Sequence, residues 1–463
     1  MKTLFARTLF CSIFLVLPAT RLHAQAEPAP QVSGQPAPPL PSAAGALHID
    51  ERSSTADPAV PLTLADAEAR TLKNQPRLLA ERFRAQAAMK QITEARSGYF
   101  PQIYGNLTAV DANGDTAVAA GALTTSSIST RAAGGASLVQ MITDFGHTSN
   151  LVQSVRLAAN ASSQQEQSTS QLVLMQVRDT YFAAQAAESV LKTAQAVLDF
   201  RRVTLRQLTA LAQSQLRSTL DVQFAQVMVS EAELAVVRAE SNMQKTQAQL
   251  AASMGEESRQ RYVLTEEPLP ADPDADPAPY IDQAITSRPD LKALHLRSES
   301  ATHEARAERD RNFPTVNALA AGGEVPVHDA TIQHEYGAVG VNVNIPIFNG
   351  GLFAARAAEV RLEASAADKD ATLREVEIVR DVRMALADAR DAYLQLDVTQ
   401  RLVDQTNIAM HLAKARYDAG LGSIVELNQA ELNQTSALIT AASARYDYLR
   451  SMNAFQFALG DIH

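Results

Sequence analysis

The chain is long and acidic, with almost no cysteine. It has 463 residues, of which 41 are Lys or Arg and 51 are Asp or Glu, giving a net charge of −10 with one Cys and no Trp. This charge disfavours nucleic acid and anionic surfaces as partners. A single cysteine excludes a framework of intrachain disulfides.

The N-terminus has the pattern of a secretory signal. Lys2 and Arg7 precede an apolar run over 9–17, and an Ala-Gln-Ala sequence follows, so we expect residues 1–26 to be cleaved. Cys11 lies inside the apolar run, where we expect no lipid attachment. Cleavage would leave 38 basic residues (41 less 3) against 51 acidic ones, a net charge of −13. No later apolar run is long enough for a membrane-spanning helix, so we expect none.

Ordered structure is expected to begin after a proline-rich segment. Residues 27–61 are mostly Pro, Ala, Ser and Gly, which predicts a flexible tail. A helix is predicted to open at Leu62, because Thr63 and Asp66 have capping-box spacing. It is expected to continue to about Ser97, where a Tyr-Phe-Pro sequence follows.

Two long segments, 147–254 and 352–459, repeat each other at an offset of 205 (352 less 147). The first contains no Gly or Pro, and the second contains only Gly420 and Gly422, so each is predicted to be one very long helical hairpin. Apolar residues recur every seven positions, which is typical of a coiled-coil seam. These residues are Val177, Ala184, Leu191, Leu198, Leu205 and Ala212, and then Val382, Ala389, Leu396, Val403, Met410 and Tyr417.

The whole chain is predicted to be a tandem duplication. Each repeat reads as a helix, two strands and a long helical hairpin, the first over 62–255 and the second over 279–463. Residues 256–278 between them are acidic and proline-rich, which predicts an irregular connector.

Residues 339–347 alternate strictly, which is typical of a strand with one lipid face and one wet face. Its partner is expected to begin near Thr315 and to fade at Gly322. In the first repeat we expect strands over 102–110 and 131–143, joined by a loop of small polar residues around 121–129. The alternative is a soluble hairpin packed on the helices. Val339, Val341, Val343 and Ile345 are the predicted lipid-facing residues, and Asn342 and Asn344 the predicted lumen-facing ones.

Four strands cannot close a barrel, and open strand edges are not tolerated in lipid. Three copies would supply twelve strands, an even number within the range of outer-membrane barrels. The expected fold is therefore mainly α with a transmembrane β part. Tandem-duplicated hairpins would form an α-barrel, and four strands per chain would contribute to a trimeric 12-stranded β-barrel.

With these features the chain resembles the TolC-like outer-membrane efflux proteins. The resemblance is carried by the segments 345–351, 416–421, 444–449 and 458–460. It implies a homotrimer in the lipid of the outer membrane, with a long periplasmic extension that meets an adaptor protein and an inner-membrane transporter. The protein would be a passive exit duct for efflux or type I secretion, with no cofactor and no catalytic residues.

Both hairpin turns carry a hydroxyl followed three residues later by an acid, Ser218 with Asp221 and Ser423 with Glu426. This spacing predicts a capping box at the start of each return helix. The resemblance implies more: acids at Glu426 and one turn later narrow the periplasmic mouth, and Tyr417 pairs with Asp221 to hold it shut. Gln429 stands where the second acid would be. The alternative is that Asp221 and Glu426 only cap their helices.

The two turns are expected to differ in shape and in their contact with the adaptor. The first contains Leu216 and Arg217 and has no glycine, whereas the second contains Gly420 and Leu421. A turn without glycine has no residue that adopts positive φ at little cost.

No motif for a metal, a phosphate or a nucleophile is present. His328 and His334 share a predicted surface loop, and we expect them to be solvated rather than ligands. The alternative function is a periplasmic coiled-coil adaptor or envelope scaffold. Drug, metal and protein export cannot be distinguished from this sequence.

Overall fold

The computed structural model describes residues 60–111, 116–120, 124–128, 131–257, 260–328 and 333–462, with backbone alone for 116–120 and 124–128. The expected signal peptide and nearly all of the expected tail lie outside these residues. The last two positions of that tail, Val60 and Pro61, belong to a strand. The predicted end of the tail is therefore two residues too late.

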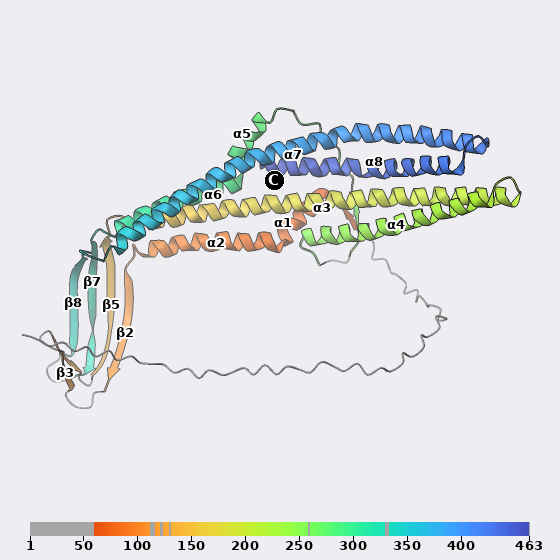
Figure 1. Cartoon of the computed structure of the whole chain (residues 1–463). Helices are drawn as coiled ribbons and strands as arrows, with labels where there is room; N and C mark the ends of the chain where they lie inside the picture. The colour runs from red at the N-terminus through yellow and green to blue at the C-terminus, as the bar shows by residue number, and fades with distance from the viewer. Residues whose placement is uncertain are drawn as a thin grey trace, which may run out of the picture. The chain divides into compact units, whose positions relative to one another are not determined.

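The helices are α1 (Leu64–Asn74), α2 (Pro76–Ser97), α3 (His147–Gln213), α4 (Thr219–Ser253), α5 (Ala278–Ser287), α6 (Pro289–Asp310), α7 (Leu352–Asp418) and α8 (Ile424–Leu459). The strands are β1 (Val60–Leu62), β2 (Gln102–Val110), β3 (Thr116–Ala120), β4 (Thr124–Ile128), β5 (Arg131–Thr143), β6 (Tyr262–Leu264), β7 (Thr315–Val327) and β8 (Glu335–Asn344). Figure 1 shows β2, β5, β7 and β8 at one end of the long helices and the hairpin turns at the other.

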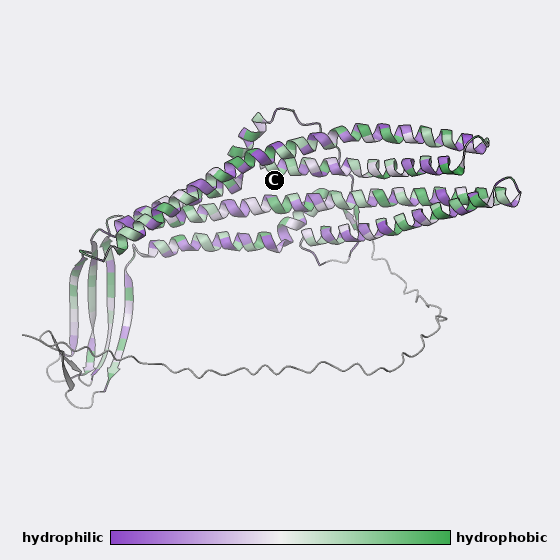
Figure 2. Ribbon diagram, in the orientation of Figure 1, coloured by the Kyte–Doolittle hydropathy of each residue, from purple (hydrophilic) through white to green (hydrophobic). Residues whose placement is uncertain are grey.

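The two predicted helical hairpins are confirmed as α3 with α4 and α7 with α8. Helices α3 and α7 have 67 residues each, so each is about 100 Å long at a rise of about 1.5 Å per residue. The predicted seam is buried inside the first hairpin, where Leu191 and Leu198 of α3 pack against Val229, Val236 and Met243 of α4. Figure 2 shows polar and apolar residues interleaved along every long helix, as expected for helices that bury only one stripe.

The four long strands form one antiparallel sheet in the order β2-β5-β7-β8. The strands expected over 102–110 and 131–143 are confirmed. Between them, β3 and β4 pair with each other in the region expected to be a loop. Strand β7 runs on to Val327 rather than fading at Gly322.

The last predicted strand is displaced. Strand β8 begins at Glu335 and ends at Asn344, so Ile345 and Ile347 lie beyond it. The alternation of apolar residues continues past Asn344, but Pro346 has no N–H group to donate to a neighbouring strand. The prediction followed side-chain pattern alone and therefore ran too far.

Thr63 caps the first helix as its spacing with Asp66 predicts, but the predicted bounds of that helix are wrong. Leu62 is in β1, and Thr63 is the N-cap of α1, with its Oγ1 accepting from the backbone N of Asp66 at 3.1 Å. The helix then breaks at Gln75, because Pro76 disfavours helical backbone at the residue before it. The connector is likewise not wholly irregular, since β6 pairs in parallel with β1.

The duplication extends to how each repeat packs. Gly255, with φ of 72°, would place a Cβ 2.8 Å from the carbonyl oxygen of Asn74, beside the break between α1 and α2. Gly460, with φ of 74°, similarly lies against Arg288, at the break between α5 and α6. Gln75 and Arg288 each donate to a carbonyl at the end of the return helix, at 2.8 and 3.0 Å. Both repeats therefore fix their broken front helix to the end of their hairpin.

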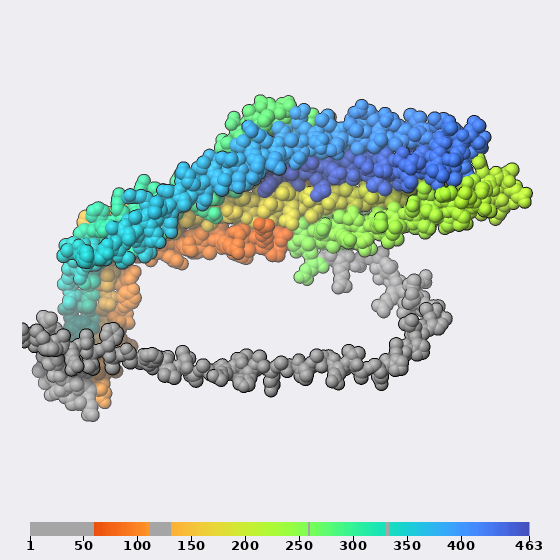
Figure 3. All heavy atoms as spheres, viewed as in Figure 1, coloured from red at the N-terminus to blue at the C-terminus, as the bar shows by residue number. Residues whose placement is uncertain are grey.

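The helices next to the sheet form a single row. Helix α3 packs against α2 and α6, and α6 packs against α7, so the row α2-α3-α6-α7 follows the strand order. Farther along, α8 packs on α3, and Figure 3 shows α8 lying between α7 and α3. Among the described residues, none of the helices combines the length and apolar character that a membrane span requires.

A buried ion pair joins the two hairpins. Arg201 of α3 donates to the carboxylate of Glu431 in α8, and each side chain is 5% exposed. Burial raises the pKa of Glu431, and the neighbouring Arg201 opposes that rise. The neighbouring residue Arg202 contacts Glu233 within the first hairpin at 2.9 Å, with both side chains about half exposed. This pair is a matched reference for the buried one.

We expect Arg201→Ala to lower the free energy of unfolding by about 3–5 kcal/mol at pH 8, because it leaves a carboxylate buried without its cation. Arg202→Ala should cost less than about 1 kcal/mol, because that pair is solvated. Without the cation, the pKa of Glu431 in the folded state should be higher still. The loss of unfolding free energy caused by Arg201→Ala should therefore shrink as pH falls through that pKa, because the buried carboxylate becomes protonated. Denaturant unfolding followed by circular dichroism at pH 8 and pH 5 measures both effects. Equal losses in the two variants would contradict this account.

Candidate functional site

The ends of the two hairpins lie together. We call the turn over 214–218 the first tip and the turn over 419–423 the second tip. Leu208 and Ala225 of the first hairpin share an apolar cluster with Ala413, Tyr417 and Leu427 of the second. The cluster holds the two tips side by side.

Each tip contains one residue with left-handed backbone. In the second tip it is Gly420, with φ of 76°, and in the first it is Gln215, with φ of 60°. Glycine adopts this conformation at little cost, whereas a residue with a Cβ is strained by roughly 1–2 kcal/mol. The expected difference in shape is therefore not found at this step, because both turns use the same left-handed conformation and differ here only in residue type.

The structure brings Tyr417 and Asp221 together across the two hairpins. Tyr417 is 4% exposed, and its hydroxyl donates to Oδ2 of Asp221 at 2.8 Å. Burial and the adjacent carboxylate raise the pKa of Tyr417 to about 12. The hydroxyl therefore keeps its proton at physiological pH and remains a donor.

Asp221 does not form the capping box that its spacing predicts. The Oγ of Ser218 accepts from the backbone N of Leu220 at 3.1 Å, and the N of Asp221 donates to the backbone oxygen of Ser218. At the second tip one of the two bonds of the predicted capping box forms, because Ser423 Oγ accepts from the N of Glu426 at 3.1 Å. The two matching sequences therefore behave differently.

Besides the bond from its backbone N to Ser423, Glu426 has a partner for its side chain. Its carboxylate lies 3.4 Å from the guanidinium of Arg416, and both side chains are about half exposed. Gln429 donates to Asn433 at 3.0 Å and borders the same open groove as Glu426 between α7 and α8. Glu426 is thus partly neutralised within its own hairpin.

Arg217 is turned inward. Its guanidinium carbon lies 4.2 Å from the centre of the Tyr417 ring. Its Nη2 donates to the backbone oxygens of Tyr417 at 2.7 Å and Asp418 at 3.2 Å. By contrast, Leu216 and Leu421 are 70% and 75% exposed. Of the four residues predicted to contact an adaptor, the structure therefore places Arg217 against the other hairpin.

The sheet has two chemically different faces. Residues directly opposite one another on neighbouring strands share a face, so the strand register assigns each side chain. One face is largely apolar and includes Ile103, Leu107, Ala136, Leu138, Val316, Ala318, Ala320, Val339, Val341 and Val343. The other face holds most of the polar residues, including Gln102, Tyr104, Asn106, Ser137, Asn317, Asn342 and Asn344.

The apolar face is open to solvent in the single chain. Val339, Val341 and Val343 are 88%, 65% and 53% exposed, and Leu107 is 91% exposed. Exposed apolar surface of this extent marks a contact with lipid or with another protein. The helices of the same chain do not cover this face, so the alternative of a soluble hairpin packed on the helices has no support in the structure.

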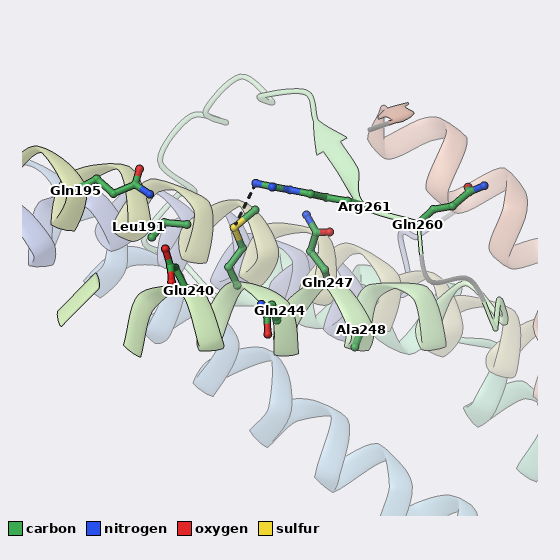
Figure 4. A pocket seen from close by; sticks show the side chains of 9 residues that line it. Leu191, Gln195, Glu240, Gln244, Gln247, Ala248, Gln260 and Arg261 are labelled. Carbon is green, nitrogen blue, oxygen red and sulfur yellow. Dashed lines mark hydrogen bonds between the residues drawn. The ribbon is translucent and has the colours of Figure 1, made fainter. Parts of the chain in front are cut away.

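A groove of about 510 Å³ lies beside the first hairpin, lined by α3, α4 and the connector. Figure 4 shows Arg261 reaching over α4, with its guanidinium 3.9 Å from Sδ of Met243, among the side chains of Gln195, Gln244 and Gln247. The described residues of the lining include no Ser, Cys or His, and Glu240 is the one carboxylate among them. Across the part of the chain that the structure describes, there is also no group of three or more His, Cys, Asp or Glu residues able to hold a metal.

Comparison with known proteins identifies the family. The profile of the outer membrane efflux protein family matches residues 69–256 and 280–461. The alkaline protease secretion protein AprF of Pseudomonas aeruginosa is 26% identical over 192 residues, which span 40% of either chain. Outer membrane protein TolC of Vibrio cholerae is 25% identical over 86% of this chain and 91% of its own.

The fold has close counterparts among solved structures. The outer-membrane channel OprN superposes with a TM-score of 0.75 at 20% identity, over 86% of this chain and 89% of its own. These relatives are outer-membrane channel and secretion proteins rather than enzymes. Because the family profile covers both repeats, the chain belongs to the outer membrane efflux protein family, the outer-membrane channels related to TolC.

Proposed function

We propose that this chain is the exit duct of a tripartite efflux or type I secretion system, through which substrate passes from the periplasm to the exterior. The observation that carries the proposal is the continuity of a two-faced sheet with a row of very long helices in one chain. The apolar sheet face lies in the outer membrane, and the helices extend into the periplasm. An adaptor or scaffold protein has no need for such a sheet.

The duct is a homotrimer. Strands β2 and β8 are the two ends of the sheet, and α2 and α7 are the matching ends of the helical row. An unpaired strand edge in hydrocarbon costs several kcal/mol per unsatisfied backbone group. Three copies joined edge to edge give a 12-stranded β-barrel that continues into an α-barrel, and both layers close at the same boundaries.

The partners are a periplasmic adaptor and an inner-membrane transporter, which supplies the energy. The exposed Leu216 and Leu421 at the tips are the proposed contacts for the adaptor, together with the Gly420 turn. The relative AprF is a secretion protein, and other relatives are solvent and toluene efflux proteins, so the family serves both kinds of export. Nucleic acid is not a partner of this acidic chain.

The proposed lipid face can be tested with two adjacent residues near the middle of β8. We expect Val341→Arg to reduce assembly in the outer membrane, because an arginine facing lipid at mid-depth costs about 2–4 kcal/mol. Asn342→Arg should assemble nearly normally, because its side chain faces the lumen. Membrane fractionation and heat-modifiable gel migration of the two variants measure the difference. If both variants assemble equally well, the proposed lipid face is wrong.

The proposed gate is the contact between Tyr417 and Asp221, which closes the periplasmic mouth. Combining Tyr417→Phe with Asp221→Ala should raise single-channel conductance in planar bilayers, because it removes the 2.8 Å hydrogen bond between the hairpins. Helical content should hardly change, because a lost helix-terminal contact costs about 1 kcal/mol in helices held by many heptads.

The wild-type recording tests the duct itself. Stepwise ion conductance from purified protein is expected, and its absence from properly assembled protein would contradict the proposed function. Wild-type conductance in the double variant would instead place the constriction elsewhere.

A further inference from the structure

We infer that Arg217 is a second latch of the periplasmic mouth, which joins the first tip to the end of α7 independently of the Tyr417 hydroxyl. This inference rests on the proposed duct function. It assigns to Arg217 a positioning role inside the mouth, in place of the contact with an adaptor that its location at the tip predicts.

The first part of the latch is a cap across the two hairpins. Arg217 donates to the backbone oxygens of Tyr417 and Asp418, at 2.7 and 3.2 Å. Both residues are in the last turn of α7, which ends at Asp418. Carbonyl groups in the last turn of a helix lack the N–H partner four residues farther along it, and the helix dipole favours a cation there. The oxygen of Tyr417 also accepts from the backbone N of Gly420 at 3.0 Å, so Arg217 is a further donor to it. A side chain from one hairpin thus contributes to the cap of a helix in the other.

The second part is the stacked ring. The guanidinium lies 4.2 Å from the centre of the Tyr417 ring, and that ring is 4% exposed. A cation over an aromatic face that is largely withdrawn from water is stabilised more than an exposed one. The planar guanidinium can stack on the ring and donate to two carbonyls at once, whereas a lysine ammonium cannot do both.

The two links of the mouth are chemically separate. Asp221 accepts from the hydroxyl of Tyr417. Arg217 instead stacks on the face of the Tyr417 ring and donates to the backbone oxygen of the same residue. Tyr417→Phe therefore removes the first link and leaves every contact of Arg217 in place. The other arginine at the tips, Arg416, pairs with Glu426 inside the second hairpin and does not join the hairpins.

The test is single-channel recording in planar bilayers of the full-length protein and its variants. We expect Arg217→Gln to lower the ratio of closed to open dwell times by about tenfold, equivalent to about 1.4 kcal/mol. Combining Arg217→Gln with Tyr417→Phe should open the mouth further than either change alone. Arg217→Lys keeps the charge but should gate closer to Arg217→Gln than to wild type.

Arg206→Gln is the matched control, because Arg206 is an exposed arginine near the same end of α3 and makes no hydrogen bond or ion pair with the described residues. It should gate like wild type. Circular dichroism establishes that each variant is folded, and Arg217→Lys carries the test if Arg217→Gln does not assemble.

Gating of Arg217→Gln and Arg217→Lys at the wild-type level would overturn the latch. If Tyr417→Phe with Asp221→Ala still opened the channel in that case, the duct would stand without the latch. Absence of channels from the wild-type protein would instead count against the proposed function itself.

Discussion

Unpaired backbone at the two ends of the sheet is the constraint on which the arrangement depends. Within the described residues, β2 and β8 each pair with one neighbour, and the backbone groups on their outer edges have no partner strand. Such an edge is tolerated in water when charged or short, but it is not tolerated in hydrocarbon. The helical row ends at the same two places, because α2 leads directly into β2 and α7 directly follows β8 along the chain. In the proposed trimer, joining copies at this boundary would complete the sheet and the helical row together.

The tandem duplication supplies parts that match at this boundary. Each repeat contributes two strands to the sheet and two helices to the row α2-α3-α6-α7. Each repeat also packs its broken front helix against the end of its own hairpin, at Gly255 in the first and Gly460 in the second. The repeats differ where they meet each other. Arg201 and Glu431 form a buried ion pair between the hairpins, and Tyr417, Asp221 and Arg217 meet at the tips. The contacts proposed to bear on opening thus lie between the repeats, whereas Gly255 and Gly460 act within one repeat each.

Much of the fold could be predicted from the sequence, because the signals were long and periodic. Seven-residue spacing predicted both hairpins, because neither segment contains Pro and Gly occurs only at the turn of the second, and the strands over 102–110 and 131–143 were confirmed. The errors occurred where one backbone group decides the outcome. Pro346 cannot donate a ladder hydrogen bond, so the last strand ends before Ile345 although the alternation continues. Pro76 breaks the first helix because a proline disfavours helical backbone at the residue before it. The paired strands β1 and β6 are too short to give a periodic signal.

The candidate site was predictable in its residues and in the contact between Tyr417 and Asp221, but not in its other contacts. The resemblance to the family pointed to Tyr417 and Asp221, and the structure brings them within hydrogen-bonding distance. The sequence did not indicate that the N of Asp221 would fail to donate to Ser218 Oγ. Ser218-Thr219-Leu220-Asp221 has the same spacing as the sequence at the start of α8, where the corresponding bond forms. The inward turn of Arg217 was equally hidden. Its partners lie about two hundred positions away in the chain, and local sequence carries no information about them.

The most direct test of the central claim is the structure of the purified protein in detergent or lipid nanodiscs by electron cryo-microscopy. We expect three copies around one axis, with β8 of each copy hydrogen bonded to β2 of the next and α7 of each copy beside α2 of the next. A fully folded monomer, or an assembly in which β2 and β8 remain unpaired within the membrane, would contradict this arrangement.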